Sequence, residues 1–376
     1  MFSSLSSIVL LGITYFSIIV SAVPVFTYEN NPLGNSFPNP SPDQLKDIQV
    51  QAHGSLSNGK PPPKVDPDTL TSLRFVAFNE LFEVAFFTSL LNNITNKIEH
   101  YEAHDGVDDE LFRTNLIKVF TAIQAQEELH ALNANNALKN FGAEPIKPCK
   151  YDFSVVYLED AIAVAKTFTD LVMGTLQDVA QNMAIKGDPG FIRGVLSSLG
   201  QEGEQNGFFR SFQGRIPSAL PFLTTSTREI AFSAVNQFFV VPGSCPNANT
   251  IDLPVFPPLA ISTQDTLDLA RNPRPRNLGF SFDLPEGGAK PEWKSDWTGL
   301  KLAYINMQNV PRAMDLLDVR VEHNKVNFNV LFPFDQGTFG NSMTIALIVS
   351  ADANFTNAVT LMKAPTIIGP ALIQVN

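Results

Sequence analysis

Apolar residues recur every three or four positions through much of the first two thirds of the chain, the spacing that predicts amphipathic helices. The first such segment begins at Asp66, a suitable N-cap, has Pro67 at its first helical position and runs to about residue 98. Further helices are predicted over about 108–141, about 155–185, and from the break at Gly187-Asp188-Pro189 to about 213. Four long helices with short or moderate connections favour an antiparallel four-helix bundle.

The pattern changes on both sides of this bundle. Residues 23–65 are rich in Pro, Asn, Ser and Gly and predict an irregular arm. After a fifth helical segment near 227–239 the apolar period becomes two, with Val326, Phe328, Val330 and Phe332 on one face of a predicted strand. The expected fold is mainly α with a β-rich C-terminal extension. Its parts are a signal peptide (1–22), the arm (23–65), a helical bundle with the fifth helical segment (66–240) and the β-rich region (241–376).

Composition narrows the classes of partner. Lys and Arg total 26 against 37 Asp and Glu, and the net charge of -11 repels phosphate backbones, so nucleic acid is not an expected partner. Hydrophobic residues make up 44% and charged residues 17%, which permits a sizeable core and argues against disorder.

The N-terminus predicts export. Ile8 to Val20 forms an apolar segment, and Val20-Ser21-Ala22 places small residues before a plausible cleavage point. An uncleaved membrane anchor is the alternative. No later stretch approaches the ~18 apolar residues of a membrane span. We therefore expect a secreted, extracellular or cell-wall protein with no membrane association after cleavage.

The two cysteines and two sequons agree with export. Cys149 and Cys245 are an even pair, for which a disulfide is the default in an oxidising compartment. Two buried free thiols, or pairing between molecules, are the alternatives. Asn93 and Asn354 begin Asn-x-Thr sequons and are candidate glycosylation sites.

Charged residues lie on the apolar stripes of three of the four helices. Glu80, Glu127, His130 and Glu202 are each spaced three, four or seven residues from apolar neighbours. A carboxylate at such a position is costly unless it is paired or bound to a metal. Because Glu127 and His130 are three residues apart, they share one helix face. The pattern predicts a shared polar centre inside the bundle.

This pattern and two local segments resemble the ferritin-like carboxylate proteins, in which inward-facing Glu and Glu-x-x-His residues hold two metals. Residues 78–87, and 126–130 followed by 143–145, resemble the first two helices of secreted fungal ferritin-like proteins. That stress-response and sexual-development group is related to desiccation-associated proteins. The resemblance covers roughly residues 66–213. It implies a ferritin-like fold and an extracellular or cell-wall protein linked to stress or development, with cell-wall association or self-association.

Two positions depart from the metal-binding pattern. The third helix places Thr169 where the pattern has Glu, with Asp170 next to it, and the fourth has Gln205 where the second His belongs. An amide oxygen is a weaker ligand than imidazole for iron or manganese. Six expected ligands become four, so we expect no dinuclear oxidase centre.

Three interpretations of the remaining residues stay open. One is a polar core in which Glu80, Glu127, His130, Glu202 and Gln205 are joined by hydrogen bonds. Another is a single iron or manganese ion held by Glu80, Glu127 and His130. The last is a two-metal site that recruits Glu83, Glu128 or Glu204.

The favoured function is a non-catalytic exported protein with a degraded metal centre, holding no cofactor or at most one metal ion. A metal-dependent oxidase or peroxide-consuming enzyme is one alternative. An extracellular binding module, with a groove between the bundle and the C-terminal region, is the other.

Overall fold

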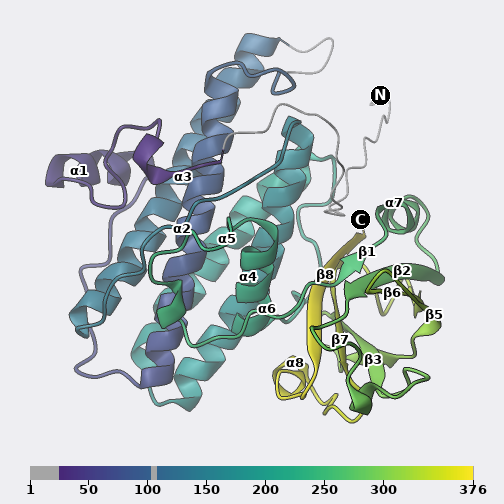
Figure 1. Cartoon of the computed structure of the whole chain (residues 1–376). Coiled ribbons are helices and arrows are strands. Elements are labelled where there is room, and N and C mark those ends of the chain that lie inside the picture. The colour runs from purple at the N-terminus through teal and green to yellow at the C-terminus, as the bar shows by residue number, and fades with distance from the viewer. Residues whose placement is uncertain (1–24, 103–107, 376) are drawn as a thin grey trace.

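Long helices form one half of the molecule and two β-sheets form the other (Figure 1). The computed structural model describes residues 25–102 and 108–375, so the predicted signal peptide lies outside the described residues. The helical half contains α2 (Pro67–Thr95), α3 (Asp109–Asn140), α4 (Leu158–Ile185), α5 (Ile192–Phe212) and α6 (Arg228–Phe238). These bounds agree with the predicted ranges to within a few residues, except that α5 begins after a short turn, η2 (Pro189–Phe191).

Capping residues fix where the helices begin and end. The Asp66 side chain accepts a hydrogen bond from the Asp68 backbone N–H at the start of α2, and Asp108 accepts one from the Leu111 N–H at the start of α3. Both satisfy N–H groups that have no partner within the helix. After α3, Gly142 adopts a positive φ of 72°, the left-handed conformation that ends many helices.

The N-terminal arm is more ordered than we expected. It contains η1 (Tyr28–Asn30) and a ten-residue helix, α1 (Pro42–Gln51), so the prediction of an irregular segment over 23–65 is wrong there. Ser41 and Gln44 form a reciprocal capping box that starts α1. Only Ile48 is fully buried in this helix, so its apolar period is too weak to be seen in the sequence.

Phenylalanine fills the interior of the helical half. α2 packs along α3, and α4 packs along α5. Phe82 and Phe87 on α2 contact Phe168 on α4, and Phe87 also contacts Phe209 on α5. By length and composition alone α2 could span a membrane, contrary to the sequence expectation, but 83% of its apolar window is buried inside the protein. It is the central helix of this core.

The C-terminal half is built on two antiparallel four-stranded sheets. One has the order β1-β2-β6-β5 and the other β4-β3-β7-β8. The strands are β1 (Ala260–Ile261), β2 (Arg276–Asp283), β3 (Leu300–Asn306), β4 (Arg312–Met314), β5 (Leu317–Glu322), β6 (Lys325–Phe332), β7 (Ser342–Ser350) and β8 (Ile367–Val375). The remaining elements are η3 (Ala248–Thr250), α7 (Thr263–Arg271), η4 (Pro291–Trp293) and α8 (Ala358–Leu361).

The second sheet is covered on both faces. Every residue of β7 is buried: Ile345 and Leu347 join the helical core, whereas Ala346 and Ile348 join the core between the two sheets. A strand buried on both faces appears as a continuous apolar run rather than an alternating one. The β-rich region is therefore a layered unit that also packs on the helices.

A short segment between α5 and α6 connects the two halves. Thr224 donates to the Met343 carbonyl at 2.7 Å, and Ser226 donates through its backbone N–H to the Gly174 carbonyl at 3.3 Å. Gly174 permits this approach, because a Cβ there would collide with the Thr224 carbonyl oxygen. The Cys149–Cys245 disulfide joins the segments that follow α3 and α6, so the predicted pair is present in the structure. It is consistent with an extracellular location.

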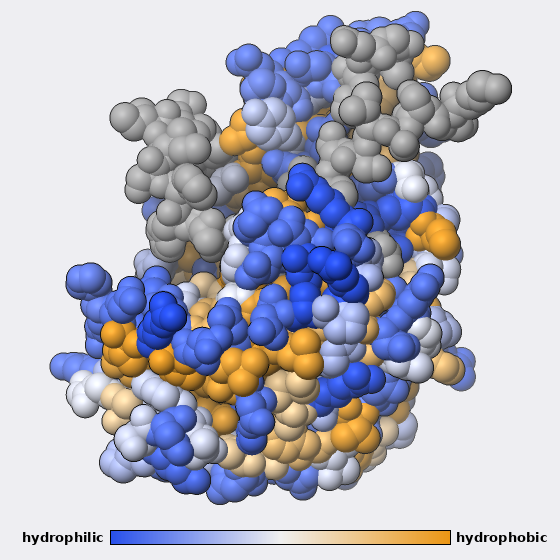
Figure 2. Space-filling view, turned by 90° about the vertical axis from the view of Figure 1, so that its right-hand side faces the viewer, coloured by the Kyte–Doolittle hydropathy of each residue, from blue (hydrophilic) through white to orange (hydrophobic). Residues whose placement is uncertain are grey.

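The outer surface of the β-rich half carries apolar side chains. Figure 2, seen from the β-rich side, shows them gathered across the lower part of that face. The large exposed apolar residues of β5 and β6 are Leu317, Val321 and Leu331. The charged Asp318 and Arg320 lie between Leu317 and Val321 along β5, and Glu322 ends the strand. Such charges discourage edge-to-edge pairing of strands.

Candidate metal centre

Four of the predicted residues meet inside the helical half. Glu80 comes from α2, Glu127 and His130 from α3, and Glu202 from α5. Each offers one possible ligand atom, and these atoms all lie within 4.8 Å of one another. The three carboxyl groups are buried and the His130 side chain is 18% exposed. The structure thus brings together the four residues that the sequence pattern selected.

Glu127 is held on both oxygens. Its Oε2 lies 2.9 Å from His130 Nδ1, and its Oε1 accepts a hydrogen bond of 2.6 Å from Gln205 Nε2. Glu80 Oε2 lies 3.5 Å from the same His130 nitrogen. Gln205 therefore acts as a hydrogen-bond donor that orients Glu127, and its amide nitrogen faces that carboxylate.

Glu202 is different from its neighbours. Both of its carboxylate oxygens are buried, and neither has a hydrogen-bond partner among the described residues. A buried polar atom without a partner costs about 1–3 kcal/mol, and more when it is charged. The hypothesis of a polar core joined throughout by hydrogen bonds therefore fails at Glu202. A cation among the four side chains would supply the missing partner.

Burial and crowding keep protons in the centre when no cation is present. Burial raises the pKa of Glu80 to about 7, although His130 opposes the change. Burial, followed by the charges of Glu80 and Glu127, raises the pKa of Glu202 well above its ordinary value. Burial alone would lower the pKa of His130, but the charges and hydrogen bonds of Glu127 and Glu80 raise it well above its ordinary value.

Glu83 adds a further buried carboxyl beside the centre. It lies one turn after Glu80 on α2, is 1% exposed, and accepts a hydrogen bond of 3.1 Å from Asn79 Nδ2. Burial, then the charges of Glu202, Glu127 and Glu80, raise its pKa well above the ordinary value. It is close enough to interact with the four-residue group but is not a member of it.

The positions expected to have lost their ligands offer no replacement. Thr169 is buried, and its hydroxyl has no hydrogen-bond partner among the described residues. Asp170 is also buried, but its two oxygens accept hydrogen bonds from Asn206 at 2.7 Å and Gln374 at 2.9 Å. The Asp170 carboxylate is therefore engaged between α4, α5 and β8.

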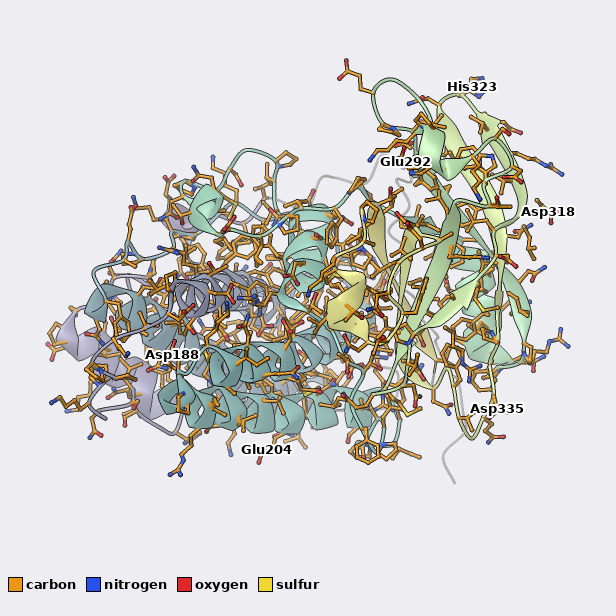
Figure 3. The ribbon with its side chains drawn as sticks, turned by 90° about the horizontal axis from the view of Figure 1, so that it is seen from below. Asp188, Glu204, Glu292, Asp318, His323 and Asp335 are labelled. Atoms are coloured by element: carbon orange, nitrogen blue, oxygen red, sulfur yellow. A yellow bond between two sulfur atoms is a disulfide. The ribbon has the colours of Figure 1, made fainter. Side chains whose placement is uncertain are left out.

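The other two carboxylates considered as ligands of a second metal are not members of the four-residue group. Glu128 is buried but accepts a hydrogen bond of 2.6 Å from Asn35 of the N-terminal arm. Glu204 is exposed and points away from the helical core on α5 (Figure 3). His323 is exposed at the outer end of the β-rich half, far along the chain from this centre (Figure 3).

The apolar stripes in the sequence do not predict that Glu83, Glu128 and Asp170 are buried. Each is adjacent in sequence to apolar residues, as in the segment Phe82-Glu83-Val84. A helix surrounded by protein on every side buries charges that a single apolar stripe places outside. The nearly continuous apolar sequence of α2 and α4 is the feature that indicates helices buried on all sides.

Metal-free protein should become less stable as the pH rises from about 5 to about 8. The pKa of Glu80 and of Glu128 is about 7 in the folded chain, against an ordinary value of 4.5. Because their pKa is raised, the folded chain holds protons on these groups more tightly than the unfolded chain does. Their contribution to the free energy of unfolding is therefore complete below pH 4.5 and is lost as the pH rises through 7. The raised pKa of His130 acts in the same direction. Melting temperatures measured in a chelator between pH 5 and 8 check this.

Glu80→Gln should flatten that pH dependence, whereas Glu204→Gln, on the exposed side of α5, should not change it. A melting temperature that rises over the same interval would contradict the burial of ionisable groups described here.

Comparison with known proteins covers part of the chain. Residues 69–215 match the model of the ferritin-like domain family. This range contains all four residues of the centre and runs from α2 to just beyond α5. No curated protein gives a significant match to the chain.

Proposed function

Starting from a ferritin-like domain over residues 69–215, we propose that this protein is exported and binds one iron or manganese ion through Glu80, Glu127, His130 and Glu202. The single ion replaces the two-metal centre that the family pattern implies. The protein then has no dinuclear oxidase activity, and its metal has a structural or sequestering role.

The carboxylate of Glu202, which has no hydrogen-bond partner in the part of the chain that the structure describes, carries this proposal. Both of its oxygens are buried, and they lie in a group of three carboxylates and one imidazole. Three ionised carboxylates with one imidazolium have an excess of negative charge in a low-dielectric interior. Such an arrangement is stable only when protons or a cation neutralise it.

The donor set fits one first-row divalent ion. Carboxylate oxygens suit manganese and imidazole suits iron, and three oxygens with one nitrogen satisfy both. When bound, such an ion could supply Lewis-acid or redox chemistry to a molecule in its open positions. The protein's own residues orient the donors: Gln205 holds Glu127 through its Oε1, whereas the hydrogen bond between Glu127 Oε2 and His130 Nδ1 would give way, with loss of its proton, when the ion binds.

The residues do not fit a second ion. Thr169 stands where a carboxylate would be required, Asp170 is engaged by Asn206 and Gln374, and Gln205 presents its amide nitrogen to Glu127. An amide nitrogen has no free lone pair, so in this orientation Gln205 offers no ligand to a cation.

Metal analysis tests the stoichiometry. Metal-free protein titrated with Fe(II) under anaerobic conditions, or with Mn(II), should bind one equivalent per chain. His130→Ala should weaken that binding at least 100-fold, because it removes the only nitrogen donor of the group. Glu204→Gln, an exposed change on the same helix as Glu202, is the matched control and should bind normally. Two equivalents in the wild type would favour an oxidase, and none would favour a purely polar core.

Export through the secretory pathway makes a prediction about glycans. Asn354 is exposed in a turn, whereas Asn93 lies within α2 and is half-buried. A transferred glycan is bulky and needs surface room. We expect secreted protein to carry a glycan at Asn354 and none at Asn93. Mass spectrometry of glycosidase-treated protein, with Asn354→Gln as the control, checks this, and an occupied Asn93 would contradict it.

The resemblance to stress and development proteins, and the cell-wall or self-association that it implies, belong to the same proposal. The disulfide is consistent with an extracellular location, and the other parts of this proposal rest on the sequence resemblance over residues 66–213.

A further inference from the structure

A cavity lies where the helical half meets the β-rich half. Its lining comes from α2, α4, α6, β1 and β8, and includes Phe168, Leu171, Val235, Ile261 and Leu372. The space open to the centre of a water-sized sphere is about 60 Å³. That is about four times the space that one water molecule needs in the same measure. Exposed Ala260 and half-buried Phe238 also line it, so the cavity reaches the surface.

The walls of the cavity are held in place by polar contacts behind them. Gln237 of α6 donates hydrogen bonds to the Phe256 carbonyl at 2.6 Å and to the Gly369 carbonyl at 2.9 Å. These contacts fix α6 against the segment before β1 and against β8. The cavity is therefore a preformed space between anchored elements.

Two polar side chains, Asn79 and Thr167, are present in an otherwise apolar lining. Thr167 already donates its hydroxyl to the Ala163 carbonyl at 2.8 Å. Asn79 is 1% exposed and donates to Glu83, but its Oδ1 is buried and has no hydrogen-bond partner among the described residues. Water needs two to four polar partners to be stable in such a space, and this lining offers few.

These features define a ligand. We propose that the cavity binds a small apolar molecule with one hydroxyl group, such as a phenol or short alcohol, whose hydroxyl bonds to Asn79 and whose hydrocarbon packs against α4, α6 and β1. A hydroxyl both donates and accepts, so it can pair with the Asn79 amide through either of its polar atoms. The apolar walls supply the affinity, and Asn79 supplies the preference for a hydroxyl.

The site is separate from the metal centre but adjacent to it. Asn79 precedes Glu80 in the sequence and is held by Glu83, whose carboxyl interacts with Glu202. A bound ligand would lie behind this pair of side chains. Binding does not require the metal, so the proposal can be tested on metal-free protein.

Calorimetric titration with phenol and with toluene, in the presence of a chelator, tests the proposal. Both probes should bind the wild type. Ala234→Leu, which extends a lining side chain of α6 into the cavity, should weaken both at least tenfold. Ala184→Leu, at an exposed position of α4, is the matched control and should bind both normally.

Asn79→Leu tests the polar contact. It should lower the affinity for phenol relative to toluene about tenfold, the value of one hydrogen bond. If Asn79→Leu does not fold, the Ala234→Leu comparison still locates the site. Failure of wild-type protein to bind either probe, equal binding by Ala234→Leu, or an unchanged phenol preference in folded Asn79→Leu would overturn the proposal. None of these outcomes depends on whether the metal centre holds an ion.

Discussion

Glu202→Gln should stabilise the metal-free protein and at the same time abolish its stabilisation by metal. The wild-type carboxylate is buried beside the carboxyls of Glu80 and Glu127, and within residues 25–102 and 108–375 neither of its oxygens has a hydrogen-bond partner. A glutamine is nearly the same size, carries no charge and can donate to those neighbours. We expect the free energy of unfolding at pH 8 to rise by about 1–3 kcal/mol.

Thermal melts with and without one equivalent of Mn(II) measure both effects. Binding to the folded state raises the wild-type melting temperature by mass action, and the variant should show little or no such rise. Glu204→Gln should behave like the wild type in both conditions. A Glu202→Gln protein that is less stable without metal, yet still stabilised by it, would show that Glu202 has partners other than a cation.

Removing the disulfide should have the largest effect on stability. Cys149 and Cys245 are 96 residues apart, and closing a loop of that length restricts the unfolded chain by about 4–5 kcal/mol in the chain-entropy model. The two segments also pair through hydrogen bonds, including that from Lys147 N–H to Asn247 Oδ1 at 2.9 Å. The folded geometry should therefore survive in Cys149→Ser/Cys245→Ser, with a melting temperature lower by about 10 °C.

Reduced wild-type protein provides the control. It should melt with the double-serine variant, and only the oxidised wild type should be more stable. Equal melting of all three forms would mean that the bridge does not restrict the unfolded chain.

The sequence predicts the helices well because their signals are local. Asp66, Pro67 and Gly142 mark helix ends by backbone chemistry that needs no tertiary context. The four residues of the centre are also visible, since a Glu or His on an apolar stripe is costly unless several of them meet. Because α2, α3 and α5 turn these stripes toward the same core, the four side chains come together there.

What the sequence does not show depends on neighbours far along the chain. β7 is an apolar run that fits either a core strand or a buried helix segment, and the helices that cover its second face decide the matter. The buried carboxylate of Asp170 is satisfied by Asn206, 36 residues later, and by Gln374, 204 residues later. The unsatisfied state of Glu202, and the cavity beside Asn79, are properties of the assembled packing and have no local signature.

A metal-soaked crystal tests the central claim most directly. Anomalous difference maps recorded on either side of the manganese absorption edge should show one peak inside the helical half, within coordinating distance of Glu80, Glu127, His130 and Glu202. A pair of peaks, or a helical interior without one at saturating manganese, would contradict the single-ion centre.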